Sequence, residues 1–150
     1  MGRIKAKSQN IKIDGKVNVN QGCCSDQYPW FSFKSLTHND HYNLSKLSSG
    51  TEREQTLLGL YERLHELSCQ PWLHWMQMRK SIGLETMTYN DICFFAAPGE
   101  VIAKDTTIYV FRFDTHLGQN KGRILGYKKD PCATLHIIGY DIDFSSYNHG

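Results

Sequence analysis

The closing stretch GRILGYKKDPCATLHIIGYDIDFSSYNHG (residues 122–150) decides the fold class. It contains two apolar runs, GRILGYK and ATLHIIGYD, joined by the basic turn KKDP, and this pattern is typical of two antiparallel strands. Upstream, ETMTYNDICFF (85–95) and TIYVFRF (107–113) predict two more strands, with the turn segments AAPGE and THLGQNKG between the runs. We therefore expect an antiparallel meander of about four strands.

Two helices are predicted before this meander. Thr51 and Glu54 have the spacing of a capping box, and apolar residues recur behind them at helical spacing, so we expect a helix from about Thr51 to Cys69. Pro71 suits the first turn of a second helix, PWLHWMQMRKSIGL, which ends near Gly83. The expected apolar stripes are Leu57, Leu60, Tyr61, Leu64 and Leu67 in the first helix and Trp72, Trp75 and Met76 in the second. The result is an α+β fold in which a helical hairpin covers one sheet face and the other face is open.

Residues 1–50 form an N-terminal extension to the helical hairpin and sheet of residues 51–150. Asp14 and Gly15 lie between alternating apolar residues, which predicts a β-hairpin in IKIDGKVNV. WFSFKSL predicts a short strand, and the polar residues 37–50 predict a loop. A chain of 150 residues has the usual length of one domain, so we expect a single domain.

Composition limits the possible functions. The net charge is only +2, so a nucleic-acid site must be local rather than the effect of a global positive field. The five cysteines form no C-x-x-C pair, which argues against a disulfide framework or zinc ribbon and favours a cytoplasmic protein. Cys93 and Cys132 lie in apolar stretches and are expected to be small buried residues. No apolar run has the length of a membrane span, and no apolar core of a secretory signal follows the first basic residues.

Cationic side chains on two neighbouring strands are the first candidates for a site. If the strand is regular, Arg112 lies on the face opposite its two phenylalanine neighbours. Arg123 opens the next strand, and Lys128 and Lys129 end it. A guanidinium group can bind two phosphate oxygens at once, so these residues are predicted to contact phosphate. The alternative is that Arg112 is a sheet-surface residue paired with Asp114.

The polar ending of the chain supplies further candidates. Asp141 and Asp143 share a strand face and could provide a base, bind a divalent cation or cap a turn. Tyr147 and His149 follow the last strand, where an exposed imidazole suits acid and base chemistry, although a frayed tail is the alternative. No third carboxylate lies at metal-site spacing, so we expect no metal and no other cofactor.

The order of strand, two helices and terminal meander, with an arginine in VFRFDT, a second in GRILGY and the ending SSYNHG, resembles the RelE/YoeB superfamily of bacterial toxins over roughly residues 51–150. The resemblance implies an RNase that cuts messenger RNA in the ribosomal A site without a metal and is held in check by a small antitoxin. By position, Arg123 corresponds to the family's catalytic strand arginine. Tyr147 and His149 fall where the family's C-terminal aromatic or imidazole groups act.

The leading hypothesis is therefore a metal-independent endoribonuclease that acts on messenger RNA, with the ribosome presenting the substrate. His149 or Asp143 would take the proton from a ribose 2′-hydroxyl, and Arg123, with Arg112 or Lys128, would stabilise the charge on the phosphoryl oxygens. Tyr147 would protonate the leaving oxygen or stack on a base.

Two alternatives remain. The runner-up is a non-catalytic protein-binding module of a phage or mobile element that blocks or tethers a partner, favoured by the aromatic segments WFSF and SSYNH. A cysteine-dependent enzyme that uses Cys132 and His136 ranks last, because residues four apart on a strand share a face without touching.

Overall fold

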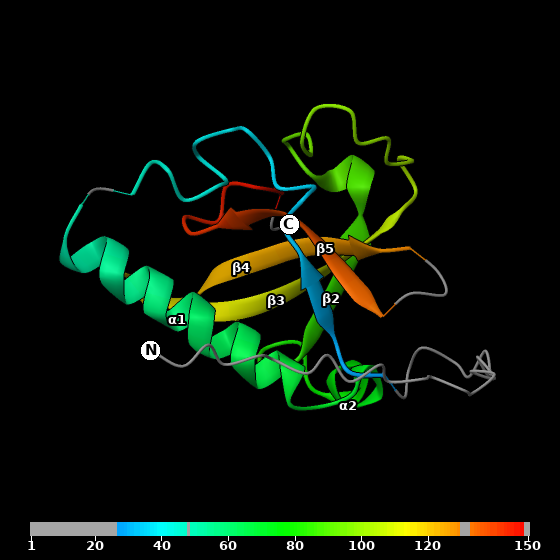
Figure 1. The fold of residues 1–150 in the computed structure, drawn as a ribbon, viewed down its shortest axis with the longest axis horizontal. Coiled ribbons are helices and arrows are strands. Elements are labelled where there is room, and N and C mark those ends of the chain that lie inside the picture. Colours follow the sequence, from blue (N-terminus) through cyan, green and yellow to red (C-terminus); the bar gives the residue numbers. More distant parts are fainter. Residues whose placement is uncertain (1–26, 48, 130–132, 149–150) are drawn as a thin grey trace, which may run out of the picture.

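The computed structural model describes residues 27–47, 49–129 and 133–148. The α+β class is confirmed: two helices precede a meander of strands, and a five-stranded mixed sheet lies between the helices and a layer of loops (Figure 1). The elements are β1 (Trp30–Ser32), α1 (Thr51–Ser68), α2 (Trp72–Gln77), β2 (Leu84–Thr88), β3 (Thr107–Thr115), β4 (Gly118–Lys128) and β5 (Thr134–Asp141).

The strand order is β1-β5-β4-β3-β2. Strands β2 to β5 form the antiparallel meander that the alternation and turns predict. Strand β1 pairs in parallel with β5, with Phe31 opposite Leu135, and this makes the sheet mixed. The predicted hairpin at residues 11–19 lies outside the described residues.

Two strand boundaries differ from the prediction. Strand β2 ends at Thr88 rather than Phe95, because the Asp91 carboxylate accepts hydrogen bonds from the Thr88 amide (3.1 Å) and hydroxyl (2.8 Å). These bonds turn the chain into a short 3₁₀ helix. The β3–β4 turn is also tighter than THLGQNKG suggested, since Thr115 already pairs with Gly118, whose φ of 127° suits glycine.

Helix α1 begins at Thr51 as predicted, but the capping box is wrong. Gly50 occupies the N-cap position, and no side chain caps the helix. The predicted apolar stripe is confirmed in part: Leu60 and Leu67 are buried and Leu64 packs against the core, whereas Leu57 and Tyr61 are 42% and 68% exposed. Thr56 and Gly59 are buried in addition. The physical reason is a close approach to β3, where a Cβ on Gly59 would lie 2.1 Å from the carbonyl oxygen of Asp114.

Helix α2 is much shorter than expected. Pro71 is its N-cap rather than part of its first turn, and the extended backbone of Met78 ends it far before Gly83. Trp72 and Trp75 are buried as predicted, and their indole N–H groups donate to the carbonyls of Ala133 (2.8 Å) and Leu67 (3.0 Å). Met76, which was expected beside them, is 55% exposed.

The second sheet face is covered rather than open. Figure 1 shows both helices below the sheet and the connecting loops, with the end of the chain, above it. The helix-side core includes Leu67, Trp72 and Phe113. The loop-side core joins side chains of β3, β4 and β5 to Tyr42 and Phe94 of two long loops. The continuous apolar runs of the strands follow from this burial on both faces.

Candidate anion-binding site

Two arginines face each other on the loop-covered side of the sheet. Arg112 on β3 and Arg123 on β4 are directly opposed in the strand register. Each lies two residues from a member of the loop-side core, Val110 or Leu125, so alternation places both on that face, as predicted for Arg112. Opposed like charges destabilise a strand pair, so this arrangement needs negative charge nearby.

Glu85 supplies part of that charge. Its Oε2 atom lies 3.9 Å from Arg112 Nη2, and Glu85 is opposite Val110 in the β2–β3 register. Asp114, the acid that the sequence suggested as the partner of Arg112, instead accepts a hydrogen bond from the Asn120 amide (2.7 Å). Glu85 could not be recognised as a site residue from the sequence, because its proximity to Arg112 depends on the register between two strands that are distant in sequence.

Arg123 is buried between two aromatic rings. Only 4% of the residue is exposed, and its Cζ lies 4.0 Å from the ring centroid of Phe144 and 5.6 Å from that of Tyr147. Burial raises the pKa of the Tyr147 phenol, the Arg123 guanidinium acts in the opposite direction, and the resulting pKa is above its ordinary value. The structure therefore brings together Arg123 and Tyr147, two of the predicted site residues.

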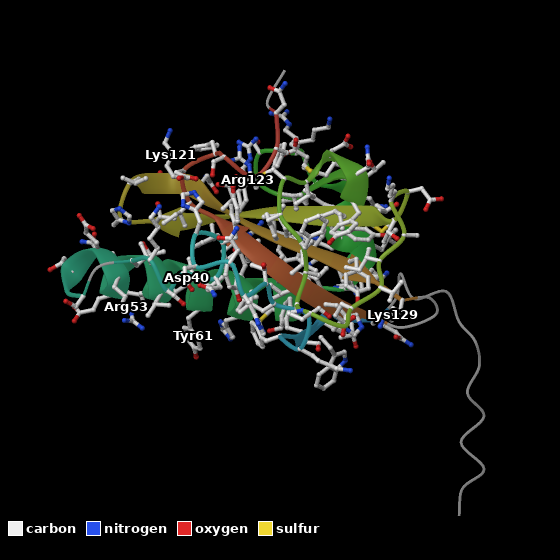
Figure 2. All side chains as sticks on the ribbon, turned by 90° about the horizontal axis from the view of Figure 1, so that it is seen from above. Asp40, Arg53, Tyr61, Lys121, Arg123 and Lys129 are labelled. Atoms are coloured by element: carbon white, nitrogen blue, oxygen red, sulfur yellow. The ribbon has the colours of Figure 1, made fainter. Side chains whose placement is uncertain are left out.

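Lys121, also on β4, contributes a further cation near the same ring (Figure 2). Its Nζ lies 5.8 Å from the ring centroid of Phe144.

Several buried polar atoms of this cluster have no hydrogen-bond partner among the described residues: Glu85 Oε2, Arg112 Nε, and Arg123 Nε and Nη1. Buried polar groups are nearly always hydrogen-bonded, so such a group marks a strained or functional location. Three of the four atoms are N–H donors. The cluster thus offers an anion several donors at once, beside two carboxylates: Glu85 near Arg112, and Asp141, which is opposite Arg123 in the β4–β5 register.

Asp141 positions the aromatic rings rather than contributing to chemistry. It is fully buried, and its carboxylate accepts hydrogen bonds from the amides of Asp143 (3.3 Å), Ser145 (3.1 Å) and Ser146 (3.2 Å) and from the Ser146 hydroxyl (2.6 Å). This is the turn-capping alternative of the sequence analysis. The turn it holds, residues 142–147, carries the two rings to Arg123.

Asp143, a predicted base, is occupied by other partners. Its Oδ2 lies 2.8 Å from His41 Nε2, and its Oδ1 accepts a hydrogen bond of 2.5 Å from the Ser145 hydroxyl. Burial alone raises the pKa of Asp143, but the Ser145 hydroxyl and the His41 imidazole outweigh it, so the pKa is lowered. Ser145 Oγ also lies 3.0 Å from the same His41 Nε2, while Lys46 Nζ lies 3.0 Å from Nδ1. A catalytic triad needs the serine and the acid on different ring nitrogens, so this cluster is not one.

The two predicted lysines do not join Arg123. Lys128 Nζ lies 4.5 Å from the Trp72 ring, on the helix-covered face. Lys129 Nζ lies 3.8 Å from Glu100 Oε2, and Figure 2 shows Lys129 at one end of the molecule, well apart from Arg123 near its middle. His149, the other predicted base, lies outside the described residues.

The structure describes only one of the two cysteines that were expected to be buried. Cys93 is exposed rather than buried. Its Sγ donates a hydrogen bond to the Ser145 carbonyl (3.2 Å) and lies 3.1 Å from the Tyr42 hydroxyl. Cys132 lies outside the described residues. His136, its proposed partner, stacks on Tyr127 with ring centroids 5.1 Å apart, and burial followed by the nearby Lys129 charge lowers the pKa of His136.

Within the ranges that the structure describes, no three or more histidine, cysteine, aspartate or glutamate side chains are grouped so that they could hold a metal ion. None of the described helices combines the length and apolarity needed to cross a membrane. Comparisons with family models, with curated proteins and with solved structures give no match for this chain. The function is therefore inferred from the geometry of the cluster around Arg123.

Proposed function

We propose that the protein is a toxin-like, metal-independent endoribonuclease that acts on messenger RNA. The observation that supports this best is the buried guanidinium of Arg123, whose Nε and Nη1 have no partner among the described residues. It lies beside a tyrosine and opposite a second arginine, which is paired with Glu85, and Asp141 is its register partner on β5. A guanidinium binds the oxygens of a phosphodiester in a fixed planar geometry, and aromatic rings beside it can stack on RNA bases.

Glu85 takes the role of general base in this proposal, in place of His149 and Asp143. Its Oε2 has no hydrogen-bond partner in the described part of the chain, whereas the oxygens of Asp143 contact His41 and Ser145. Glu85 accepts the proton of a ribose 2′-hydroxyl, and the resulting oxyanion attacks the adjoining phosphorus. The attack forms a 2′,3′-cyclic phosphate.

The other residues stabilise the charge and the leaving group. Arg123 and Arg112 neutralise the negative charge that builds on the two non-bridging phosphoryl oxygens. The bond from phosphorus to the 5′-oxygen breaks, and the Tyr147 hydroxyl donates its proton to that oxygen. The raised pKa of Tyr147 keeps this proton in place at neutral pH. Only RNA can react in this way, because DNA lacks the attacking hydroxyl.

The ribosome and an antitoxin are the proposed partners. A net charge of +2 gives little long-range attraction for RNA, so the ribosome would bring the message to the site. An antitoxin would have to keep the enzyme inactive in the cell that produces it.

The experiment compares wild type with Arg123→Gln and with the matched control Arg53→Gln, which removes the same charge from the exposed first turn of α1 (Figure 2). Wild type and the control should arrest bacterial growth and cleave ribosome-bound message. Arg123→Gln should lower the cleavage rate roughly a hundredfold or more while the circular dichroism spectrum is retained. If wild type cleaves no message on ribosomes, the proposal is wrong.

A protein-binding module without catalysis is the second candidate, favoured by exposed aromatic side chains around β1. Tyr28, Trp30 and Phe33 are 53%, 71% and 49% exposed, and such residues are common anchors of protein interfaces. If Trp30→Ala abolishes growth arrest but Arg123→Gln does not, binding rather than cleavage is the activity.

A further inference from the structure

We infer that the turn of residues 142–147 is a lid that covers Arg123 and must open before a phosphate can bind there. The inference rests on the proposed function and adds a means of regulating the same site. It follows from three observations: the burial of Arg123, the backbone conformation of Phe144, and the contacts that hold the turn closed.

The closed turn leaves no room for a phosphate on the covered side of the guanidinium. A phosphate oxygen must approach an arginine N–H to about 2.7–2.9 Å between heavy atoms. The Phe144 ring centroid is already 4.0 Å from Arg123 Cζ, which is a stacking distance, and the residue is 4% exposed. Nε and Nη1 nevertheless have no partner among the described residues, so the closed state leaves these two nitrogens of the covered guanidinium without a hydrogen bond.

The tip of the turn has a strained backbone. Phe144 has a φ of 62°, in the left-handed region that bulky side chains rarely adopt. Non-glycine residues remain in this region only when surrounding contacts hold them there. Opening would let Phe144 return to an ordinary conformation, so the closed state is opposed by its own backbone.

Besides the Asp141 hydrogen bonds, contacts from other loops hold the tip of the turn. His41 Nε2 pairs with Asp143 at 2.8 Å, and the Ser145 hydroxyl lies 3.2 Å from the Tyr42 hydroxyl. Cys93 Sγ donates to the Ser145 carbonyl at 3.2 Å, and the Cys93 amide donates to the Ser146 carbonyl at 2.9 Å. These contacts come from other loops. They can break together with the Asp141 hydrogen bonds to the amides of Asp143 and Ser145, while the two hydrogen bonds from Ser146 to Asp141 keep the base of the turn attached.

A native cysteine allows the lid to be locked. In Ser145→Cys, oxidation should join the introduced thiol to Cys93, whose backbone is hydrogen-bonded to the neighbouring residue Ser146. Binding of a short fluorescent 2′-O-methyl RNA oligonucleotide, which cannot be cleaved, is measured by anisotropy before and after reduction. We expect the oxidised protein to bind at least roughly tenfold more weakly, because a locked lid removes the open fraction that binds. The double variant Ser145→Cys, Cys93→Ser should not respond to oxidation.

A second variant tests the inference without a disulfide. His41→Ala removes the contact between the imidazole and the Asp143 carboxylate. The variant should bind the same oligonucleotide several-fold more tightly than wild type, since a larger fraction of the protein is open. His38→Ala, an exposed histidine three residues away, is the matched control and should bind like wild type.

The outcomes separate the lid from the function. Weaker binding on oxidation with tighter binding by His41→Ala supports the lid. Equal binding by oxidised and reduced Ser145→Cys, with the Cys93 cross-link verified by mass spectrometry, overturns the lid and leaves the proposed function intact. If the disulfide does not form, unchanged affinity of His41→Ala overturns the lid. If wild type and all variants, His41→Ala included, fail to bind the RNA, the lid is wrong, and the cleavage assay on ribosomes tests the proposed function separately.

Discussion

At the scale of single residues, the buried charge of Arg123 is the feature of the site that most needs an explanation. A buried charge without a full set of partners is costly, and a fold keeps one only where surrounding contacts hold it. Here the rings of Phe144 and Tyr147 cover the guanidinium, while a second arginine opposes it across the strand pair. An anion would relieve both the repulsion and the missing hydrogen bonds, which is why we connect this cluster with phosphate.

Glu85 gives the first prediction. Glu85→Gln keeps the size of the side chain but removes the proposed base, so we expect the rate of message cleavage to fall roughly 10²–10⁴-fold with little change in KM. Glu62→Gln, which changes an exposed glutamate of α1, should leave the rate unchanged. Equal rates for Glu85→Gln and wild type would remove Glu85 from the mechanism.

The lowered pKa of Asp143 predicts that the stability of the fold depends on pH. Its pKa in the folded protein lies below the ordinary value of 3.8, so the charged form stabilises the fold above that value. This contribution is lost as the pH falls from 3.8 through the lower folded pKa. In urea unfolding, wild type should exceed Asp143→Asn in stability at neutral pH, and the difference should vanish in strong acid. Asp40→Asn, at an exposed position, should show no such trend.

A site residue could be predicted from the sequence where its placement depends only on residues near it in the chain. Strand alternation alone indicates the face of Arg112, and the position of Tyr147 just after the last strand suggests its approach to Arg123. Glu85 and Phe144 could not be recognised, because one depends on the pairing register and the other on the turn that Asp141 holds. The same applies to His41, whose partner Asp143 is distant in sequence.

At the scale of elements, helix α1 is positioned by a glycine as well as by its buried leucines, Leu60 and Leu67. Gly59 lets the helix backbone contact the carbonyl of Asp114, and Thr56 Oγ1 accepts a hydrogen bond from the His116 amide at 3.2 Å. These contacts hold the β3–β4 hairpin against the helix. The period of the leucines predicted the extent of α1 well, but part of the buried face was set by contacts that are not visible in a helical pattern.

Gly59→Ala therefore tests the packing of α1. Alanine usually stabilises a helix relative to glycine by up to about 1 kcal/mol. At this position the added methyl would overlap the Asp114 carbonyl oxygen, so we expect a net loss of roughly 1–3 kcal/mol in the free energy of unfolding. The control Leu58→Ala, at a position 57% exposed on the same helix, should change stability much less. A more stable Gly59→Ala protein would contradict this packing.

At the scale of the whole molecule, the charges are balanced and the site is small. The chain carries 17 lysines and arginines against 15 acidic residues, so attraction to RNA must come from the few groups in the cluster. The α+β class was predictable because each strand and helix has a clear local period. The parallel edge strand β1 and the loop layer were not, since both depend on pairing and burial between distant segments.

Salt dependence measures how many phosphates the molecule contacts. If Arg112 and Arg123 neutralise about two phosphates of a single strand, the logarithm of the association constant should fall against the logarithm of salt concentration with a slope of about −1.4, because each phosphate contributes roughly −0.7. Titrations with the 2′-O-methyl oligonucleotide at several salt concentrations give this slope. A slope several times steeper would indicate a broad basic surface instead.

The most direct test observes the Nε–H resonance of Arg123 by nuclear magnetic resonance during titration with a 2′-O-methyl RNA oligonucleotide. A phosphate bound at the cluster should shift this resonance saturably and slow its exchange with water, while the resonance of the exposed Arg53 stays in place. If the RNA binds and the Arg123 signal does not move, the cluster is not a phosphate site and the nuclease proposal is wrong.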